Sequence, residues 1–501
     1  MKYLRSALLP VTLLLFLCLM PMSVSAQESG ELSYGTGAVR LYNSAATDTP
    51  VEAMALDDSL VEYVIDAHRQ GLSEIPIYDK GYRINKSELY SLQQERMYDA
   101  PDLFYVSNQY GYSEYSDGTV HSIIPVYTMS GSALEEAKAE YEEMIEDITC
   151  QAAHLESELE IALFYHEYIV ANFEYDTDYE IYDAYTMLKT REGVCQAYTL
   201  LYTELLERAG IENVAVVSDG LVHAWNAIEL DGEWFLCDLT WDDPVPNTAG
   251  YIGHTYFLRS ASSFGHALSD GSADWYEVDG VSRSYSSRYD NAIWTNAYTW
   301  MHVYGGALYY YDAQTTYLCA YSLDSGALTE LITIDTRAVI HGTGDYYQGA
   351  SFGLCGYGDR LYYAEYISGG YAIYEYSVTN AEKTLVESFA HSCTDTCYET
   401  CVLYPMRMYA DANVIYYVLE DLLNFGTGSV YSFEAEEYVS SEPILMDVDG
   451  DGEVTNTDIA VYVRYLSGWN TELVFECADV NSDGKYNNRD VIAIIKYLSE
   501  K

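Results

Sequence analysis

A single cysteine stands at the start of a helical pattern in the stretch EGVCQAYTLLYTELLERAG, residues 192–210. Apolar residues recur at helical spacing from Ala197 to Leu205, and Gly210 is suited to end the helix. We therefore expect Cys195 in the first turn, where the positive end of the helix dipole and unpaired N–H groups favour a thiolate. The chemistry of such a thiolate is nucleophilic attack on a carbonyl carbon, for which it needs a histidine nearby.

A histidine and an aspartate follow in the stretch VAVVSDGLVHAWNAIELDGEWFLCDLTWDDP. The Asp-Gly pair between alternating apolar segments predicts a two-residue β-hairpin turn. That turn pairs Leu230 with Glu233, and the same register makes His223 and Asp238 diagonal cross-strand neighbours, with Cα atoms roughly 7 to 8 Å apart. A helix that carries Cys195 onto this face would complete a set of cysteine, histidine and carboxylate groups for nucleophilic catalysis.

The motifs GVCQAY, HAWNAIELDGEW and DLTWDD together resemble the core of the transglutaminase-like superfamily of papain-type cysteine enzymes. The resemblance covers about residues 155–250 and implies a papain-like α+β fold for them. Carried over residue by residue, it implies Cys195 as the catalytic nucleophile, His223 as the base and Asp238 as the orienting carboxylate.

The resemblance also implies acyl transfer through a thioester, in which Cys195 attacks a protein amide. The sequence leaves the acceptor open between water, which gives a peptidase or deamidase, and an amine, which gives a cross-linker. The Cys195 backbone N–H is the natural first oxyanion donor, and Tyr175 and Gln196 are candidates for the second. Two other classes stay open, a non-catalytic carbohydrate- or protein-binding component and a glycoside hydrolase, although no carboxylate pair stands out among 78 acidic residues.

Two stretches near the C-terminus, DVDGDGEVTNTD and DVNSDGKYNNRD, place oxygen-bearing side chains at alternate positions and a carboxylate at the twelfth. This pattern around a glycine turn is typical of a calcium loop, so we expect two Ca²⁺ ions. The predicted ligands are the side chains of Asp447, Asp449, Asp451, Asp458, Asp479, Asn481, Asp483 and Asp490 and the backbone carbonyls of Glu453 and Lys485.

Each loop is followed by an apolar helical stretch, IAVYVRYLSG or VIAIIKYLSE, whereas Pro443 precludes an ordinary entering helix before the first loop. This loop-then-helix duplication resembles a type I dockerin over about residues 444–501. The resemblance implies docking to a cohesin module of a scaffoldin in a cellulosome, an extracellular complex that degrades plant cell walls. The partner-binding residues that it implies are Asn456, Thr457 and Arg464 in the first half and Asn488, Arg489 and Lys496 in the second.

The first 26 residues have the features of a secretory signal peptide. Lys2 and Arg5 precede an apolar run from Ala7 to Leu19, and small residues lead to a cleavage site after Ala26. This run is shorter than the ~20 residues of a membrane-spanning helix. We therefore expect a secreted, extracellular protein that is attached to a cellulosome or cell surface and has no membrane span. The formal charge of −54 disfavours nucleic acid and anionic membranes as partners.

The remaining segments predict further α+β structure and a β-rich region. Upstream of the cysteine motif, LFYVSNQYGY and TVHSIIPVYTM read as strands and ALEEAKAEYEEMIEDI as a helix. Downstream, GGALYYYD, GDRLYYAE and ANVIYYVL share a tyrosine pair at a near-constant interval, which predicts an internal β-repeat, either an incomplete propeller or a meander. Its aromatic residues are candidates for binding cell-wall polysaccharide. Ten cysteines in 501 residues are too few for a disulfide scaffold, so apolar cores must hold the domains.

The expected fold is therefore a multidomain α+β protein with a papain-like, transglutaminase-like core, a β-repeat region and a small all-α calcium-binding dockerin. The expected parts are a signal peptide at 1–26, an N-terminal α+β region at 27–150, the catalytic core at 151–285, a Tyr-rich β-repeat region at 286–440 and the dockerin at 441–501.

Overall fold

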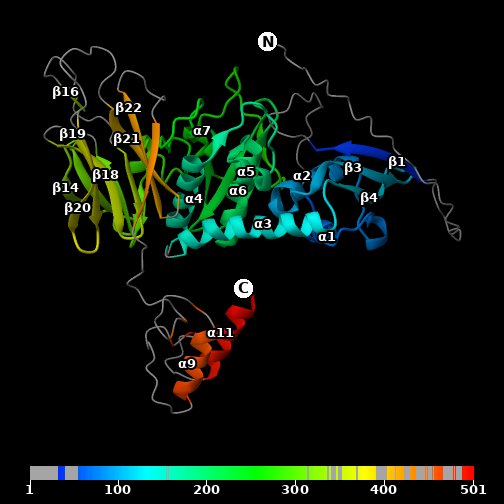
Figure 1. Ribbon diagram of the computed structural model, residues 1–501. Helices are drawn as coiled ribbons and strands as arrows, with labels where there is room; N and C mark the ends of the chain where they lie inside the picture. The colour runs from blue at the N-terminus through cyan, green and yellow to red at the C-terminus, as the bar shows by residue number, and fades with distance from the viewer. Residues whose placement is uncertain are drawn as a thin grey trace, which may run out of the picture.

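The computed structural model describes most of the chain between Leu32 and Glu500 (Figure 1). The expected signal peptide lies outside the described residues. The described residues are 32–39, 55–153, 155, 157–312, 315–335, 338–339, 346–347, 353–367, 370–390, 403–411, 413–421, 429–435, 446, 448, 454, 456–466, 478, 480 and 488–500.

The N-terminal region is a four-stranded antiparallel sheet with strand order β1-β3-β4-β2, accompanied by three helices. The two predicted strands and the predicted helix are confirmed as β3, β4 and α3. The elements are β1 (Ser33–Ala38), α1 (Asp58–Arg69), β2 (Ile75–Pro76), α2 (Lys86–Asp99), β3 (Val106–Glu114), β4 (Val120–Tyr127) and α3 (Ser132–Thr149).

Helix α2 belongs to the N-terminal region and joins it to the next part of the chain. It begins with a capping box formed by Asn85 and Glu88, which satisfies the N–H groups of its first turn. On one side it contacts α1, and on the other it contacts α6 (Cys195–Arg208) and β7 (Asn213–Ser218). Because both sides are covered, even the polar residues from Gln93 to Arg96 are buried.

The central part packs helices against a second antiparallel sheet with strand order β10-β7-β8-β9. Helix α6 lies on β7 and β8 and also contacts α4 and α5. A short parallel pair, β5 and β6, precedes α6. The remaining bounds are α4 (Glu158–Asn172), β5 (Glu174–Tyr175), α5 (Ala184–Thr190), β6 (Glu192–Gly193), β8 (His223–Leu230), β9 (Glu233–Cys237), α7 (Leu239–Asp242), α8 (Ala261–Phe264) and β10 (Trp275–Glu277).

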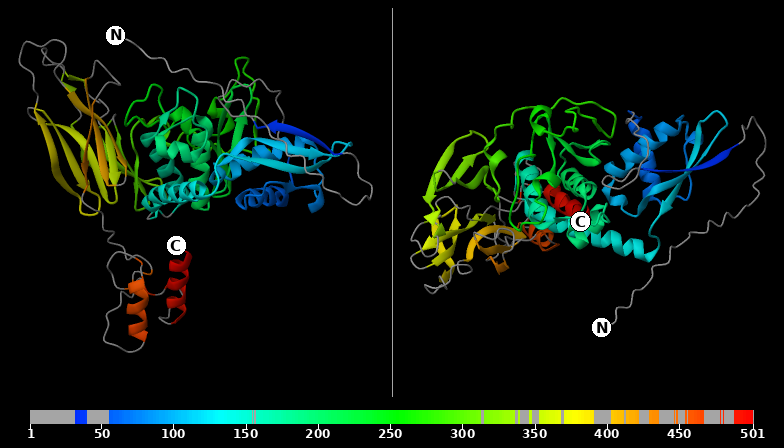
Figure 2. Two further views of the ribbon diagram at one scale, coloured as in Figure 1. Left: turned by 45° about the vertical axis from the view of Figure 1, so that its right-hand side comes forward. Right: turned by 90° about the horizontal axis from the view of Figure 1, so that it is seen from above.

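The described residues between 302 and 434 form antiparallel sheets that lie beyond α4, on the side away from the N-terminal region (Figures 1 and 2). The three tyrosine pairs fall on β12, β18 and β22, which are the second strands of three separate sheets. The strands are β11 (His302–Tyr304), β12 (Ala307–Asp312), β13 (Tyr317–Ser322), β14 (Leu328–Thr333), β15 (Ala338–Val339), β16 (Tyr346–Tyr347), β17 (Leu354–Tyr357), β18 (Arg360–Ile367), β19 (Gly370–Ser377), β20 (Glu382–Ala390), β21 (Leu403–Asp411), β22 (Val414–Asp421) and β23 (Ser429–Glu434).

One apolar core runs through most of the described chain. Buried residues from Val39 to Ala435 form a single connected cluster, so the N-terminal region, the central part and the sheets share their interfaces. The two C-terminal helices, α9 (Asn456–Leu466) and α11 (Asn488–Glu500), have a small core of their own around Tyr462 and Ile494. Among the described residues, we find no helix that combines the length and apolar character needed to cross a membrane.

Candidate active site

Cys195 is the first residue of α6, as the sequence predicts. Val194 precedes it in an extended conformation, and its apolar side chain accepts no hydrogen bond from the N–H groups of the first turn. The strand pair β5 and β6 fixes the approach to the helix, because the Asp176 N–H donates to the Gly193 carbonyl at 2.9 Å. The thiol is therefore held at the positive end of a 14-residue helix.

His223 is the first residue of β8, and the turn after β8 has the predicted register. The ladder between β8 and β9 ends at the pair Asn226 and Cys237, so Asp238 has left the sheet. Asp238 instead caps the short helix α7, and its Oδ1 atom accepts the Trp241 N–H at 3.1 Å. The strand end and the helix start together aim the carboxylate at the histidine.

The three predicted residues come together in the structure. The Nε2 atom of His223 donates to Oδ2 of Asp238 at 2.6 Å, and the histidine also has a side-chain hydrogen bond with Cys195. The exposed fractions are 1% for Cys195, 6% for His223 and 0% for Asp238. Burial by itself lowers the pKa of His223, but the charges of Asp238 and Cys195 outweigh it and raise that pKa to about 10. The arrangement therefore favours an imidazolium beside the sulfur.

Three tyrosines lie close to the thiol. Burial is the larger cause of their raised pKa values, and the charge of Cys195 raises these values further. The three tyrosines are Tyr175 on β5, Tyr182 before α5 and Tyr98 on α2 of the N-terminal region. The Tyr98 hydroxyl is buried and has no hydrogen-bond partner among the described residues. Gln196 is directed elsewhere, because its amide donates to the Tyr182 carbonyl and the Met97 sulfur. Of the two candidate oxyanion donors, Tyr175 is thus the better placed.

Sequence reasoning missed the residues that surround the histidine and aspartate. His266 follows α8 and shares the Oδ2 atom of Asp238 with His223, at 2.7 Å from its own Nε2 atom. The Trp241 ring stacks on both histidines, with centroid distances of 5.5 Å to His223 and 4.0 Å to His266. Asn226 on β8 donates to Thr203 on α6 at 2.9 Å and so ties the sheet to the cysteine helix. The sequence offers only a lone histidine in FGHAL as a signal of this environment.

His223, Asp238 and His266 also form the one group of potential metal ligands found within the described ranges. Two ligand atoms of a tetrahedral zinc ion lie roughly 3.3 Å apart, given Zn–N and Zn–O bonds of about 2.0 Å. The observed separations of 2.6 and 2.7 Å are shorter and are those of charge-assisted hydrogen bonds. The geometry of the three groups is therefore that of hydrogen bonds between the two histidines and Asp238 and not that of a zinc site.

A second buried network lies nearby and is a packing feature. His166 on α4 bonds to Asp242 at 3.0 Å, so it is packed as expected, although its Nδ1 atom lacks a partner among the described residues. Glu167 accepts from His254 at 3.0 Å and from the Met301 N–H at 2.5 Å. Burial raises the pKa of Glu167 to about 7, against the opposing effect of His254. These contacts fasten α4 to the segment that leads into β11.

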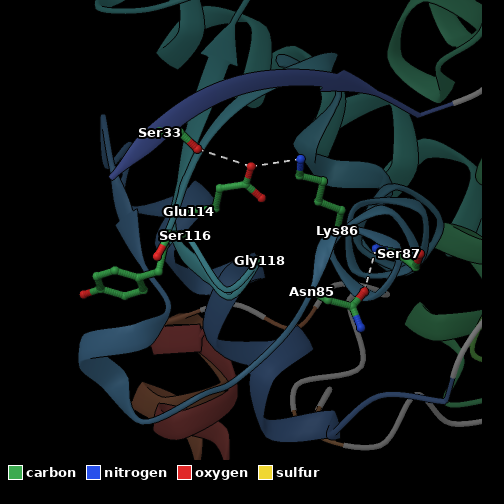
Figure 3. Close-up of a pocket in the computed structure, with 8 residues that line it drawn as sticks. Ser33, Asn85, Lys86, Ser87, Glu114, Ser116 and Gly118 are labelled. Atoms are coloured by element: carbon green, nitrogen blue, oxygen red, sulfur yellow. Dashed lines mark hydrogen bonds and ion pairs between the residues drawn. The ribbon is translucent and has the colours of Figure 1, made fainter. Parts of the chain in front are cut away.

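A separate hollow of about 430 Å³ opens at the other end of α2 (Figure 3). Glu114 lies in it and accepts hydrogen bonds from Ser33 at 3.3 Å and from Lys86 at 2.9 Å. Lys86 begins α2, whereas Met97 in the last turn of α2 contacts Gln196. The length of the helix thus separates this polar hollow from Cys195.

Most of the predicted calcium ligands lie outside the described residues: Asp447, Asp449, Asp451, Glu453, Asp479, Asn481, Asp483 and Lys485. The closing aspartates Asp458 and Asp490 fall in the first turns of α9 and α11, where the loop-then-helix pattern requires them. The predicted partner-binding residues lie on the same two helices: Asn456, Thr457 and Arg464 on α9, and Asn488, Arg489 and Lys496 on α11. Arg464 and Lys496 are exposed.

Comparison with protein families settles what two parts of the chain are. Residues 146–239 match the transglutaminase-like superfamily, and residues 445–499 match the dockerin type I domain. The chain carries a transglutaminase-like core and a type I dockerin. Type I dockerins bind calcium and imply a cohesin partner. The donor chemistry of the two loops, six Asp or Asn side chains before the closing aspartates, fits that ion.

Individual relatives match over limited lengths. The transglutaminase-like part is similar to kyphoscoliosis peptidase of Homo sapiens (27% identity over 132 residues, 22% of this chain and 20% of the peptidase) and of Mus musculus (28% over 131 residues, 22% and 19%). The match thus spans about a fifth of either peptidase. Among solved structures, a protein of Cytophaga hutchinsonii assigned as a cysteine protease aligns at 16% identity and a TM-score of 0.18 (28% of this chain, 57% of that chain). A transglutaminase structure aligns at 12% identity and a TM-score of 0.19 (35% and 57%).

Proposed function

We propose that this chain is a secreted, cellulosome-associated cysteine enzyme that transfers the acyl group of a protein amide through a thioester. Cys195 is the nucleophile, His223 the general acid and base, and Asp238 the carboxylate that orients the imidazole. The dockerin attaches the enzyme to a cohesin module of a scaffoldin. Of the two acceptors, we favour water, which gives hydrolysis of a peptide or side-chain amide, over an amine, which gives cross-linking.

The observation that carries the proposal is the hydrogen-bonded series from Asp238 to His223 to Cys195. The 2.6 Å bond fixes Nε2 of His223 on the carboxylate, which leaves Nδ1 for the thiol. The positive end of α6 and the imidazolium both stabilise a thiolate. A binding module has no need for this combination of charges in a buried place.

The reaction follows from these positions. The Cys195 thiolate attacks the amide carbon, and the oxygen of the tetrahedral intermediate is stabilised by the Cys195 backbone N–H, with Tyr175 nearby. The C–N bond then breaks while His223 gives its proton to the leaving amine, which leaves a thioester and a neutral imidazole. His223 next removes a proton from water, the oxygen attacks the thioester, and the released thiolate regains its imidazolium partner.

The dockerin supplies attachment. Two Ca²⁺ ions, one in each loop, hold the loops so that α9 and α11 can present the partner-binding residues Asn456, Thr457, Arg464, Asn488, Arg489 and Lys496 to the cohesin module. Export through the signal peptide at 1–26 places the chain where such scaffolds lie. The sheets between residues 302 and 434, on which Tyr431 is 45% exposed, are candidates for contact with wall polysaccharide or protein.

The test is mass spectrometry of casein and of plant-wall protein after incubation with the full chain and an added primary amine. Cleavage or deamidation that is lost in Cys195→Ala supports a hydrolase, and amine incorporation lost in the same variant supports a cross-linker. Circular dichroism of the variant checks that its fold is retained. An equal product yield from wild type and Cys195→Ala contradicts the mechanism, and no product from either favours a docked binding module.

A further inference from the structure

His266 is bonded through both of its ring nitrogens. Its Nε2 atom lies 2.7 Å from Oδ2 of Asp238, and its Nδ1 atom lies 3.1 Å from the carbonyl oxygen of Phe264. Neither a carbonyl nor an ionised carboxylate can donate a hydrogen bond, so both nitrogens must carry a proton. The geometry therefore describes His266 as an imidazolium.

The surroundings of His266 favour a positively charged ring held in one orientation. Its side chain is stacked between Phe264, with ring centroids 3.9 Å apart, and Trp241, with ring centroids 4.0 Å apart. Aromatic faces attract cations, most strongly when water is excluded. The whole residue is 4% exposed, so little of it is in contact with bulk water.

Within the hydrogen-bonded series of Cys195, His223, Asp238 and His266, the charges balance only when His266 is counted. The reactive form has negative charges on Cys195 and Asp238 and a positive charge on His223, which leaves one negative charge in excess. All three residues are buried, and an uncompensated buried charge is costly. A protonated His266 on the same carboxylate brings the sum to zero.

We propose that His266 is a positioning residue that holds Asp238 in place and supplies the fixed positive charge that lets Cys195 ionise beside His223. The inference rests on the proposed function, since it assigns His266 a part in the same reaction. His266 acts through Asp238, since its Nε2 atom is bonded to the Oδ2 atom of that carboxylate. Trp241, 43% exposed, covers both histidines on the solvent side.

Removal of the charge has a predictable direction. Loss of a cation raises the pH at which every neighbouring group gives up its proton, so the thiolate forms only at higher pH. The titratable groups that face this cluster are Cys195 on α6, His223 on β8, Cys237 on β9, Asp238 and Asp242 at α7, Tyr256 in the segment before α8, and His166 on α4. Apart from His223, only His166 among these groups can carry a positive charge. Burial lowers the pKa of His166 and its bond is to Asp242, so it does not replace His266.

The experiment measures the rate at which iodoacetamide alkylates Cys195 between pH 4 and 10, followed by peptide mass spectrometry of the full chain. His266→Gln keeps a neutral donor, and His266→Lys keeps a positive charge. We expect the pH midpoint of alkylation to rise by about one unit in His266→Gln and to return towards wild type in His266→Lys. His254→Gln is the matched control, because His254 is equally buried and also bonds through both nitrogens, but to Glu167 and Ala297.

An unchanged midpoint in a folded His266→Gln variant would overturn the inference, as would an equal rise in His254→Gln. If His266→Gln does not fold, the ¹⁵N resonances of the wild-type imidazole rings decide, since a neutral His266 at pH 7 contradicts its assigned charge. A wild-type midpoint near the ~8.5 of a free cysteine would instead contradict the proposed function itself.

Discussion

At the scale of single residues, the site depends on the carboxylate of Asp238. Its Oδ2 atom accepts from two histidines and its Oδ1 atom from the Trp241 N–H. Although burial favours the neutral acid, the charges and hydrogen bonds of His223 and His266 hold the pKa of Asp238 well below its usual range. One side chain thus orients the His223 imidazole, anchors the second histidine and caps helix α7.

Replacement of this carboxylate should change both rate and pH dependence. In Asp238→Asn, kcat/KM should fall by about 10²–10⁴-fold, because the imidazole loses its oriented partner. The pKa of His223, raised to about 10 in the native site, should fall once the Asp238 charge is gone. The alkaline limb of the kcat/KM profile therefore moves to lower pH, and rates on the substrate found by mass spectrometry measure it.

The control for this prediction is Asp242→Asn, which alters a neighbouring aspartate of α7 that bonds to His166 and not to His223. Its alkaline limb should stay at the wild-type pH. The account fails if Asp238→Asn keeps the wild-type alkaline limb, or if both variants shift it equally.

At the scale of elements, the position of Cys195 depends on the close approach of β6 to α5 and α6. An added Cβ atom on Gly193 would lie 2.8 Å from the Met187 sulfur and 2.9 Å from the Ala197 Cβ atom. Both distances are shorter than normal van der Waals contacts, so the glycine is required by packing. The segment that leads into α6 and Cys195 is therefore packed so closely that no space is left for one added methyl group.

Gly193→Ala should therefore lower the free energy of unfolding by about 1–3 kcal/mol and reduce the reactivity of Cys195, because the loop must shift to make room. Met187→Ala added to Gly193→Ala removes one of the two clashes and should recover part of both losses. Thermal unfolding and Cys195 alkylation measure the two effects. Wild-type stability and reactivity in Gly193→Ala would show that the approach is not tight.

Sequence patterns predicted the local parts of the site and missed those that arrive from a distance. Cys195 and the His223 hairpin follow from a helix start and a turn, which depend on neighbours in the chain. His266 contacts Asp238 from a segment with little regular structure, so no helical or strand periodicity in the sequence predicts its position. Helix α2 was also missed, because its buried polar residues Gln93 to Arg96 hide the apolar pattern that marks a helix.

At the scale of the whole molecule, one apolar core runs from Val39 to Ala435. The sheets add a second cluster around Leu361 and Tyr363, and the dockerin helices have a third of their own. Tyr98 of α2 reaches the surroundings of Cys195, so the N-terminal region is part of the active-site environment. The dockerin has a separate role in attachment, so we expect calcium to affect the dockerin and not the surroundings of Cys195.

Removal of calcium should separate attachment from chemistry. Chelation by EGTA should abolish capture of the chain on an immobilised cohesin and leave the alkylation rate of Cys195 unchanged, because the metal orders only the dockerin loops. Asp447→Ala combined with Asp479→Ala should reproduce the loss without a chelator. Capture that persists in EGTA, or a Cys195 rate that falls with it, would contradict this division.

The most direct test of the account compares two thiols in one sample. Cys150 is an exposed residue, and partial burial of its thiol and the charges of Asp147 and Glu146 raise its pKa. Cys195, in contrast, is buried beside His223. After brief treatment with iodoacetamide at pH 6, peptide mass spectrometry should find Cys195 alkylated well before Cys150 in wild type, and no such preference in His223→Ala. Faster labelling of Cys150, or equal labelling of Cys195 in the two proteins, would contradict an activated nucleophile.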